Sequence, residues 1–407
     1  MSGRKWLVRG LTLETVRAGN SDASTGKGAN LEALTIGRIA GIEIRVHYSW
    51  FVIFFLLLWW LAEGFFGEVY DSWSVTEAWA AAAAATILFF ASVLLHELAH
   101  SLTAKRLGLP VSSITLFIFG GVSSLTSEPS SARQEFQIAI VGPLTSFGLA
   151  AFFGTLAGVG LVSGAENSPP GAVAEYLAII NLSLGIFNLL PGFPLDGGRV
   201  LRAAVWSRSG DLLSATRWAS RSGQVIAFGL IAFGVVSILG GNFIGGAWMV
   251  VIGWFLRGAA QSSYEQLVVR RTLEGVRVGD VLDRSFVPVA PDDSLDQVVR
   301  RMLQTSQRCV PVLVSDDLLG LISIRDLKRV PEEEWPQTSA FRAMTPREKL
   351  HVTSPDEDLG RVLEVMAAND VHQLPVLDGK SFVGFVTRAD VLRLLQVRSK
   401  LREPETA

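Results

Sequence analysis

The sequence predicts a polytopic α-helical membrane domain of about six transmembrane helices, followed by a C-terminal soluble α/β module. The first observation is composition: the 407-residue chain is 49% hydrophobic and only 18% charged, which is typical of integral membrane proteins with segregated charges. The second is that segregation, because residues 47–260 are apolar with short polar breaks and the residues after 260 are rich in charge. The third is a pattern that occurs twice in the charged part.

Six hydrophobic segments are long enough to cross a bilayer, although glycines interrupt some of them. They are residues 47–66, 79–103, 136–162, 173–190, 222–240 and 243–260. Lys and Arg gather in the N-terminal segment and in the breaks after the second and fourth spans, whereas the other three breaks contain none. The positive-inside rule therefore predicts a multi-pass protein of the cell membrane with both termini in the cytoplasm. Residues 1–34 have no signal-peptide pattern and are expected to form a flexible cytoplasmic tail.

Two segments beside the first spans have β character. Residues 36–46 alternate apolar and polar side chains around glycine, which predicts a short hairpin at the membrane surface. A second β-prone segment, residues 111–121, follows span two and ends in Gly120-Gly121. A glycine pair leaves room for another backbone to approach closely, and a simple turn is the alternative.

The second span ends in His96-Glu97-Leu98-Ala99-His100. A helix places residues i and i+4 on one face, so both imidazoles can bind one zinc ion. Glu97 can then take a proton from a water molecule at the metal. Ionisable groups are costly inside a membrane, which favours a functional role. The alternative is a pair of histidines hydrogen-bonded inside a helix bundle, and it stays open until a third ligand is found.

A second polar constellation, from Asn188 to Arg199, closes the fourth span with the sequence NLLPGFPLDGGR. Its prolines and glycines break the helix at membrane depth, where irregular backbone must be buried in protein or line a wet cavity. Charge counting puts Asp196 at the level of His100. Two histidines and one carboxylate, with a fourth position left for water, form a catalytic zinc shell. Alternatively, Asp196 caps a helix or pairs with Arg199, and Glu97 merely supports a histidine.

These elements, together with Gly142-Pro143, resemble the site-2 protease family of intramembrane zinc metalloproteases over about residues 35–265. The resemblance implies that the membrane domain is a metalloprotease with one zinc ion per chain. It also implies that His96, His100 and Asp196 are the zinc ligands and that Glu97 is the general base. Many relatives also carry a PDZ module, for which the predicted loop from Arg199 to Ser222 is too short.

The same resemblance implies two contacts with substrate. Gly120 and Gly121 would belong to a strand that pairs with the unwound substrate. Asn188 would steady the substrate or the oxyanion, a role that suits an amide donor and that Asn181 could take instead.

Two copies of one pattern follow the last span in the same order and without a gap. The segment Pro291–Leu295 matches Pro355–Leu359, and Gly320–Asp326 matches Gly384–Asp390. Each copy predicts helix, apolar strand, turn, apolar strand and helix. The pair resembles tandem CBS domains, at residues 276–330 and 340–396.

Such modules bind the ribose of adenine nucleotides through a hydroxyl and a carboxylate spaced S/T-x-x-D. The resemblance implies ATP or AMP at Ser323 with Asp326, and at Thr387 with Asp390. The same spacing caps helices, and many CBS pairs only form homodimers, so both alternatives stay open.

The combined prediction is a membrane zinc endopeptidase that hydrolyses a peptide bond in or near the transmembrane helix of another membrane protein. The net charge of −2 gives no sign of nucleic-acid binding, and the single cysteine, Cys309, excludes an internal disulfide. One alternative is a transporter regulated by its CBS pair, which explains the repeat but not the zinc triad. The other is a catalytically silent scaffold that retains zinc.

Overall fold

The computed structural model describes residues 33–125, 128–165, 167–305 and 307–402. The predicted tail at residues 1–34 lies outside the described residues, except for Ala33 and Leu34, which belong to a β-strand. The described chain forms two compact units that divide between Glu265 and Gln266. Each unit has its own architecture.

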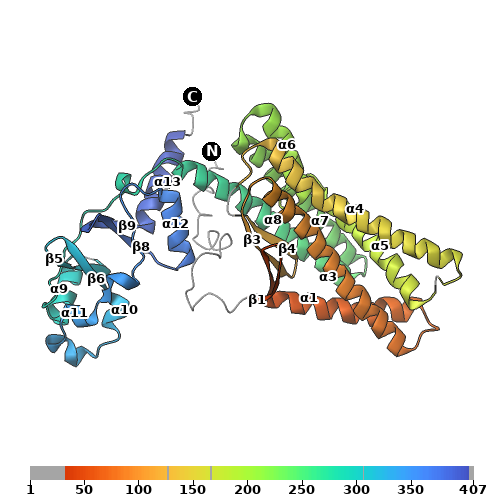
Figure 1. The fold of residues 1–407 in the computed structure, drawn as a ribbon, viewed down its shortest axis with the longest axis horizontal. Helices are drawn as coiled ribbons and strands as arrows, with labels where there is room; N and C mark the ends of the chain where they lie inside the picture. Colours follow the sequence, from red (N-terminus) through yellow and green to blue (C-terminus); the bar gives the residue numbers. More distant parts are fainter. Residues whose placement is uncertain (1–32, 126–127, 166, 306, 403–407) are drawn as a thin grey trace. The chain divides into compact units, whose positions relative to one another are not determined.

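Within the described residues, six helices of the first unit are long and apolar enough to cross a membrane (Figure 1). The predicted multi-pass domain is therefore confirmed. Each helix forms its backbone hydrogen bonds internally, as a bilayer demands. The first span combines α1 (Tyr48–Trp59), the π-helix η2 (Trp60–Phe66) and α2 (Gly67–Val69); the others are α3 (Val75–Arg106), α4 (Ala132–Val162), α5 (Pro169–Asn188), α7 (Leu212–Leu239) and α8 (Phe243–Leu273).

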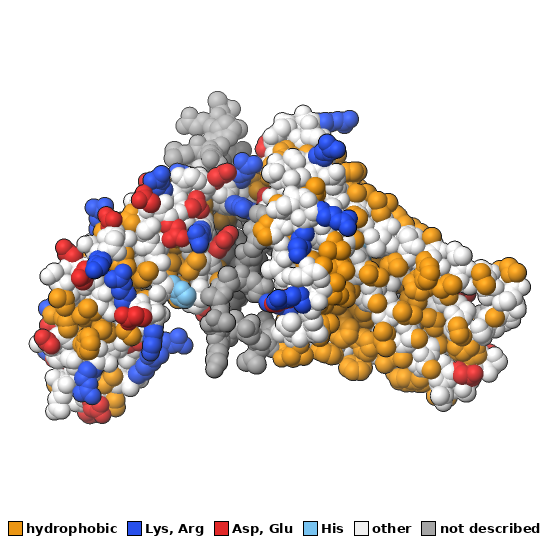
Figure 2. Space-filling model, viewed as in Figure 1, with side chains coloured by type: hydrophobic (Ala, Val, Ile, Leu, Met, Phe, Trp, Pro, Cys, Tyr) orange, Lys and Arg blue, Asp and Glu red, His pale blue; other side chains and the backbone are white. Residues whose placement is uncertain are grey.

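Charge is distributed unevenly along this unit. Figure 2 shows hydrophobic side chains over the long helices, whereas Lys and Arg side chains gather at the end where α6 and the β-sheet lie. Such a distribution fits a bundle whose sides face lipid and whose charged end faces water.

Several helices extend beyond the predicted apolar segments. Helix α3 begins at Val75 because Ser74 and Glu77 form a reciprocal capping box. Helix α7 begins at residue 212 rather than 222, because Asp211 accepts hydrogen bonds from the first backbone amides. The stretch between Arg199 and Ser222, expected as a loop, contains most of helix α6 (Asp196–Ser209). Hydropathy marks only the part of a helix that faces lipid, whereas caps decide where the helix begins.

The predicted hairpin is confirmed as part of a four-stranded sheet, β1 (Ala33–Ile39), β2 (Ile42–His47), β3 (Val111–Phe117) and β4 (Gly120–Leu125), in that order. Ala40 and Gly41 join β1 to β2 with φ values of 50° and 78°, the backbone of a type I′ turn. Strand β2 pairs parallel with β3, and β3 pairs antiparallel with β4. Residues Ile42, Ile44 and Val46 pack with Val93 of α3, which fixes the sheet beside the second span.

The second unit repeats one α/β pattern, as predicted. The first copy runs α9 (Leu295–Thr305), β5 (Cys309–Val314), β6 (Asp317–Ser323), α10 (Ile324–Leu327); the second runs α12 (Leu359–Ala368), β8 (Gln373–Asp378), β9 (Ser381–Thr387), α13 (Arg388–Arg402). Their strands form one sheet in the order β5-β6-β9-β8, with β7 (Thr345–Pro346) on β6. Short helices complete the unit: η3 (Val278–Asp280), η4 (Glu332–Gln337), α11 (Ala340–Ala343) and η5 (Arg347–Lys349). The last turn of α8 contributes Leu273 to the core of the second copy.

Close packing around α3 depends on a run of alanines. Ala81, Ala82 and Ala85 are buried in one cluster with Leu61, Phe66 and Leu177 of the neighbouring spans. Without a hydrophobic driving force between helices in lipid, small side chains help because they let backbones approach.

We expect Ala82→Leu to lower the free energy of unfolding by about 1–3 kcal/mol, because the added atoms have no room in this cluster. The measurement is thermal unfolding of the purified protein in detergent. Ala84→Leu is the matched control, since Ala84 is exposed on the same helix. Equal unfolding temperatures for the two variants would contradict the packing described.

Candidate metal centre

Helix α3 presents its two histidines to the bundle interior. His96 and His100 are only 3% and 4% exposed, and their Nε2 atoms lie 3.2 Å apart. The i,i+4 spacing predicted that both would lie on one face, and the structure brings them together as expected. A polar pair buried this deeply needs a partner that satisfies it.

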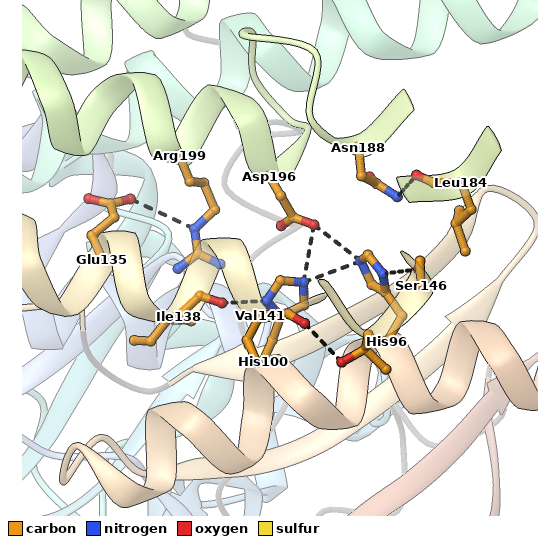
Figure 3. Close-up of polar contacts among 11 residues, drawn as sticks. His96, His100, Glu135, Ile138, Val141, Ser146, Leu184, Asn188, Asp196 and Arg199 are labelled. Carbon is orange, nitrogen blue, oxygen red and sulfur yellow. Dashed lines mark hydrogen bonds and ion pairs between the residues drawn. The ribbon is translucent and has the colours of Figure 1, made fainter. Parts of the chain in front are cut away.

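Asp196 reaches the histidines from the first residue of α6 (Figure 3). Its Oδ2 atom lies 3.1 Å from the Nε2 atom of each histidine, and the residue is 9% exposed. The loop before it folds back tightly: a Cβ at Gly197 would overlap the Leu189 carbonyl, and one at Gly198 would overlap the backbone of Gly192 and Phe193. The two glycines after Asp196 therefore allow the carboxylate to reach this position.

The three donor atoms are spaced as a zinc ion requires. Neighbouring ligands of a tetrahedral zinc ion, with bonds of about 2.0–2.1 Å, lie about 3.3 Å from one another. Here the three separations are 3.1, 3.1 and 3.2 Å. The residues present thus fit a metal with two imidazole ligands and one carboxylate ligand.

Hydrogen bonds on the far side of the imidazoles orient them toward this centre. His100 Nδ1 lies 2.6 Å from the carbonyl oxygen of Ile138, which can only accept, so Nδ1 carries the hydrogen. In the neutral ring the lone pair of Nε2 then faces His96 and Asp196. His96 Nδ1 makes the corresponding contact with Ser146 Oγ at 2.9 Å. The two Nε2 atoms and the Asp196 carboxylate can therefore share a cation, either a proton or a metal ion.

Asp196 itself is held in its charged form. When no metal is bound, burial opposes ionisation of Asp196, yet protonated His100 and His96 can donate to its carboxylate and keep the pKa of this carboxyl below its ordinary value. The helix-cap alternative is disfavoured because the cap residue of α6 is Leu195 and no side chain caps the helix. The Arg199 pair is disfavoured because Arg199 points to Glu135, whose Oε1 atom lies 3.7 Å from its Nε atom (Figure 3).

Glu97 lies between the two histidines in sequence and beside the edge of the sheet. A Cβ added at Gly121 would come within 3.2 Å of its Oε1 atom, so the carboxylate packs directly against this glycine. Gly120 and Gly121 begin β4 and pair with Phe117 and Leu116. Strand β4 is the last in the sheet order, so one of its sides is unpaired within the described sheet.

The side-chain amides of Asn188 and Asn181, the two candidates for steadying the substrate or the oxyanion, donate hydrogen bonds to other groups. Asn188 is half-buried and donates from Nδ2 to the carbonyl oxygen of Leu184, one turn earlier in α5. Asn181 is fully buried and donates to Leu177 and to Ser92 Oγ. Among the described residues, neither amide makes a hydrogen bond to the histidines or to Asp196.

Sequence reasoning missed the contribution of α4. Its buried face supplies Ser146 to His96 and the Ile138 carbonyl to His100. Gly142 lies between them, and a Cβ there would overlap the Nε2 atoms of both histidines. The Gly142-Pro143 pair was the single available signal, because a serine or a backbone carbonyl has no spacing that ties it to a distant histidine.

In the second unit the predicted nucleotide-binding residues bond to one another. Asp326 accepts from the amide and hydroxyl of Ser323, and also from Thr345 Oγ1. Asp390 accepts from the amide and hydroxyl of Thr387. Both pairs therefore cap helices in this structure. Asp326 is buried, whereas Asp390 is partly exposed.

Comparisons with known proteins agree with this division. Residues 84–168 and 162–230 match peptidase family M50, and residues 278–333 and 341–397 match the CBS domain. Rip3 of Mycobacterium tuberculosis is 38% identical over 378 residues, which cover 92% of this chain and 95% of Rip3. Zinc metalloprotease MJ0392 of Methanocaldococcus jannaschii is 30% identical over 324 residues, which cover 78% of this chain and 87% of MJ0392. The solved site-2 protease from the same archaeon aligns with 57% of this chain and 95% of its own, at 28% identity and a TM-score of 0.41.

We expect Gly142→Ala to weaken zinc binding by at least about tenfold, because its methyl group would displace both imidazoles from the centre. Zinc affinity is measured by competition with a chromophoric chelator in detergent. Gly148→Ala is the control on the same helix, where a Cβ meets nothing within 4 Å. Wild-type affinity in Gly142→Ala would show that the imidazoles do not bind metal where they lie.

Proposed function

The chain belongs to peptidase family M50 and is a zinc metalloprotease of the site-2 protease type, and from that premise we propose that it hydrolyses peptide bonds in or near transmembrane segments of other membrane proteins. The observation that carries this proposal is the meeting of His96, His100 and Asp196 donor atoms within a bundle of apolar helices. These three residues would hold the zinc ion, and Glu97 would be the general base. A protease with its centre among membrane spans is suited to substrates that lie in the bilayer.

The residues divide the reaction between them. Zinc, when bound, polarises the scissile carbonyl and makes water more acidic. Glu97 accepts the proton of the attacking water and delivers it to the leaving amine. Its place beside Gly121 supports this role, because a peptide lying along β4 would pass close to the carboxylate.

Strand β4 is the proposed docking edge for substrate. A peptide bond in a helix is hydrogen-bonded and shielded, so the substrate must unwind before it is cut. An unwound segment exposes amides and carbonyls, and an unpaired strand edge can bind them. The absence of side chains at Gly120 and Gly121 leaves room for that approach. Asn188 would help only after its amide leaves the Leu184 carbonyl.

Two other functions explain less. Transport regulated by the CBS pair leaves the three converging donors without a role. A scaffold without catalytic activity would keep the zinc ion, but it would not need Glu97 beside the unpaired edge of β4. Loss of Glu97 separates the scaffold from the enzyme.

We expect purified protein to contain about one zinc ion per chain. Glu97→Gln should retain that zinc and lose cleavage, because it removes the base alone. Asp196→Ala should lose both zinc and cleavage, because it removes a ligand. The measurements are metal analysis and cleavage of a reporter that contains a transmembrane helix. Cleavage by Glu97→Gln at the wild-type rate would reject the base, and full zinc occupancy in Asp196→Ala would reject the third ligand.

Both termini are proposed to lie in the cytoplasm, which the gathering of Lys and Arg at one end of the bundle supports. In a Cys309→Ser background, single cysteines at Asp71 and Asn167 should react with an impermeant reagent applied to whole cells. Cysteines at Arg208 and Lys380 should react only after lysis. The opposite pattern would reverse the orientation.

Adenine nucleotide is the proposed regulator of the CBS pair, with ATP or AMP held through Ser323, Asp326, Thr387 and Asp390. Support comes from the repeated hydroxyl–carboxylate pairs and from the partial exposure of Asp390. A nucleotide shifts activity only if it binds one arrangement of the module more tightly than another. The alternative role for the module is homodimer formation.

We expect Asp390→Ala to weaken ATP or AMP binding more than Asp326→Ala, because Asp326 already bonds to Thr345. A loss of paired ribose hydrogen bonds corresponds to about 1–3 kcal/mol. Calorimetry of the full-length protein measures this difference. The absence of heat and of a thermal shift with millimolar ATP or AMP would reject nucleotide binding, and an oligomer-size measurement would then test dimerisation.

A further inference from the structure

A buried carboxylate outside the metal centre ties together two of the helices that build it. Glu135, in the first turn of α4, is 0% exposed. Arg202 of α6 donates to its Oε1 atom from Nε at 2.7 Å and from Nη2 as well. Arg199 approaches the same oxygen from its Nε atom at 3.7 Å (Figure 3). Glu135 therefore connects α4 to α6 by charge.

This placement needs an explanation beyond helix stability. An acidic residue in the first turn of a helix is favourable on an exposed surface, where water also solvates it. Burying the charge removes that water and makes the carboxylate depend on its partners. Both partners come from α6, the short helix whose first residue is Asp196.

The chain is held on both sides of Asp196. After it, Arg199 and Arg202 bind to Glu135. Before it, the Phe193 ring lies beneath the Arg202 guanidinium, 5.1 Å from ring centroid to Cζ, and is itself buried. Loss of the carboxylate would remove the ionic partner of Arg202 and leave the Phe193 contact alone to hold this part of α6.

The same face of α4 supports the other two proposed ligands. Glu135, Ile138, Gly142 and Ser146 follow one another at helical spacings of three or four residues, so they line one face. Ile138 orients His100, and Ser146 orients His96. Among the described residues, the printed hydrogen-bonding partners of the Asp196 carboxylate are the two histidines, and Glu135 supports the helix that carries it through the two arginines.

We propose that Glu135 is a positioning residue for the metal centre, which sets the place of the Asp196 carboxylate through Arg199 and Arg202. The inference rests on the proposed zinc ligation by Asp196 and adds a residue that does not touch the metal. Helix α4 is then the common support of all three ligands.

The test is zinc affinity of the full-length protein in detergent, measured by chelator competition. Glu135→Gln should weaken zinc binding by about tenfold, the lower end of the effect of losing a direct partner of a metal ligand, because Glu135 acts on Asp196 through the arginines of α6. Cobalt substituted for zinc should lose the intense visible absorption of a tetrahedral site. Glu43→Gln is the control, because Glu43 also accepts from two arginines, Arg38 and Arg45, away from the centre. Wild-type affinity and spectrum in Glu135→Gln would overturn the proposal.

A double-mutant cycle separates positioning from general stability. If Glu135 acts through Asp196, then Glu135→Gln should change the residual zinc affinity of an Asp196→Ala background, titrated with added zinc, by less than about twofold. A full further loss in that background would overturn the proposal. Unchanged zinc affinity in the Asp196→Ala single variant would overturn zinc ligation by Asp196 and this inference with it. Failure of the ligand set is therefore distinguishable from failure of the positioning role alone.

A second variant keeps the test decisive if Glu135→Gln does not fold. Arg202→Lys preserves the positive charge but loses the forked contact with Glu135 and the planar contact with Phe193. It should weaken zinc binding by at least about threefold and shift the cobalt spectrum in the same direction. A folded Arg202→Lys protein with wild-type affinity and spectrum would reject the role of this ion pair.

Discussion

Three potential metal-ligand atoms converge inside an apolar helix bundle, and the neighbouring elements of the membrane unit are arranged around them. The donors of His96, His100 and Asp196 are separated by 3.1–3.2 Å and are almost entirely buried. Polar groups buried in this way depend on one another or on a bound cation, because burial removes them from bulk water. The arrangement has to be held in place by the rest of the fold, which must also leave one side accessible to a substrate.

Helix α4 helps to hold the ligand atoms in place. Ser146 and the Ile138 carbonyl fix the outer nitrogens of the histidines, and Gly142 lets the helix come close enough to do so. The glycines after Asp196 do the same for the loop that enters from α5. These glycines are needed because a side chain at Gly142 would overlap the imidazoles, and side chains at Gly197 and Gly198 would overlap the backbone of the loop before Asp196.

Local patterns predicted much of this. Hydropathy located the six spans, glycine and alternation located the hairpin, and the repeat located the two α/β halves. The i,i+4 rule paired the histidines, and the proline–glycine break marked Asp196. Helix α6 was missed because its polar residues hide it from hydropathy. Ser146 and Glu135 were missed because contacts between distant helices leave no spacing in sequence. For Asp326 and Asp390 the ambiguity is physical, since a helix cap and a ribose site use the same atoms.

The open side of β4 has a consequence for selectivity. A strand edge binds main-chain amides and carbonyls, which every peptide has, so it gives little discrimination among side chains. If substrates dock there, the choice between them passes to the cost of unwinding their own helices. Segments with glycine or proline, which weaken a helix, would be cut in preference to uniform runs of leucine and alanine. The enzyme would then select substrates by the stability of their transmembrane helices rather than by the identity of particular side chains.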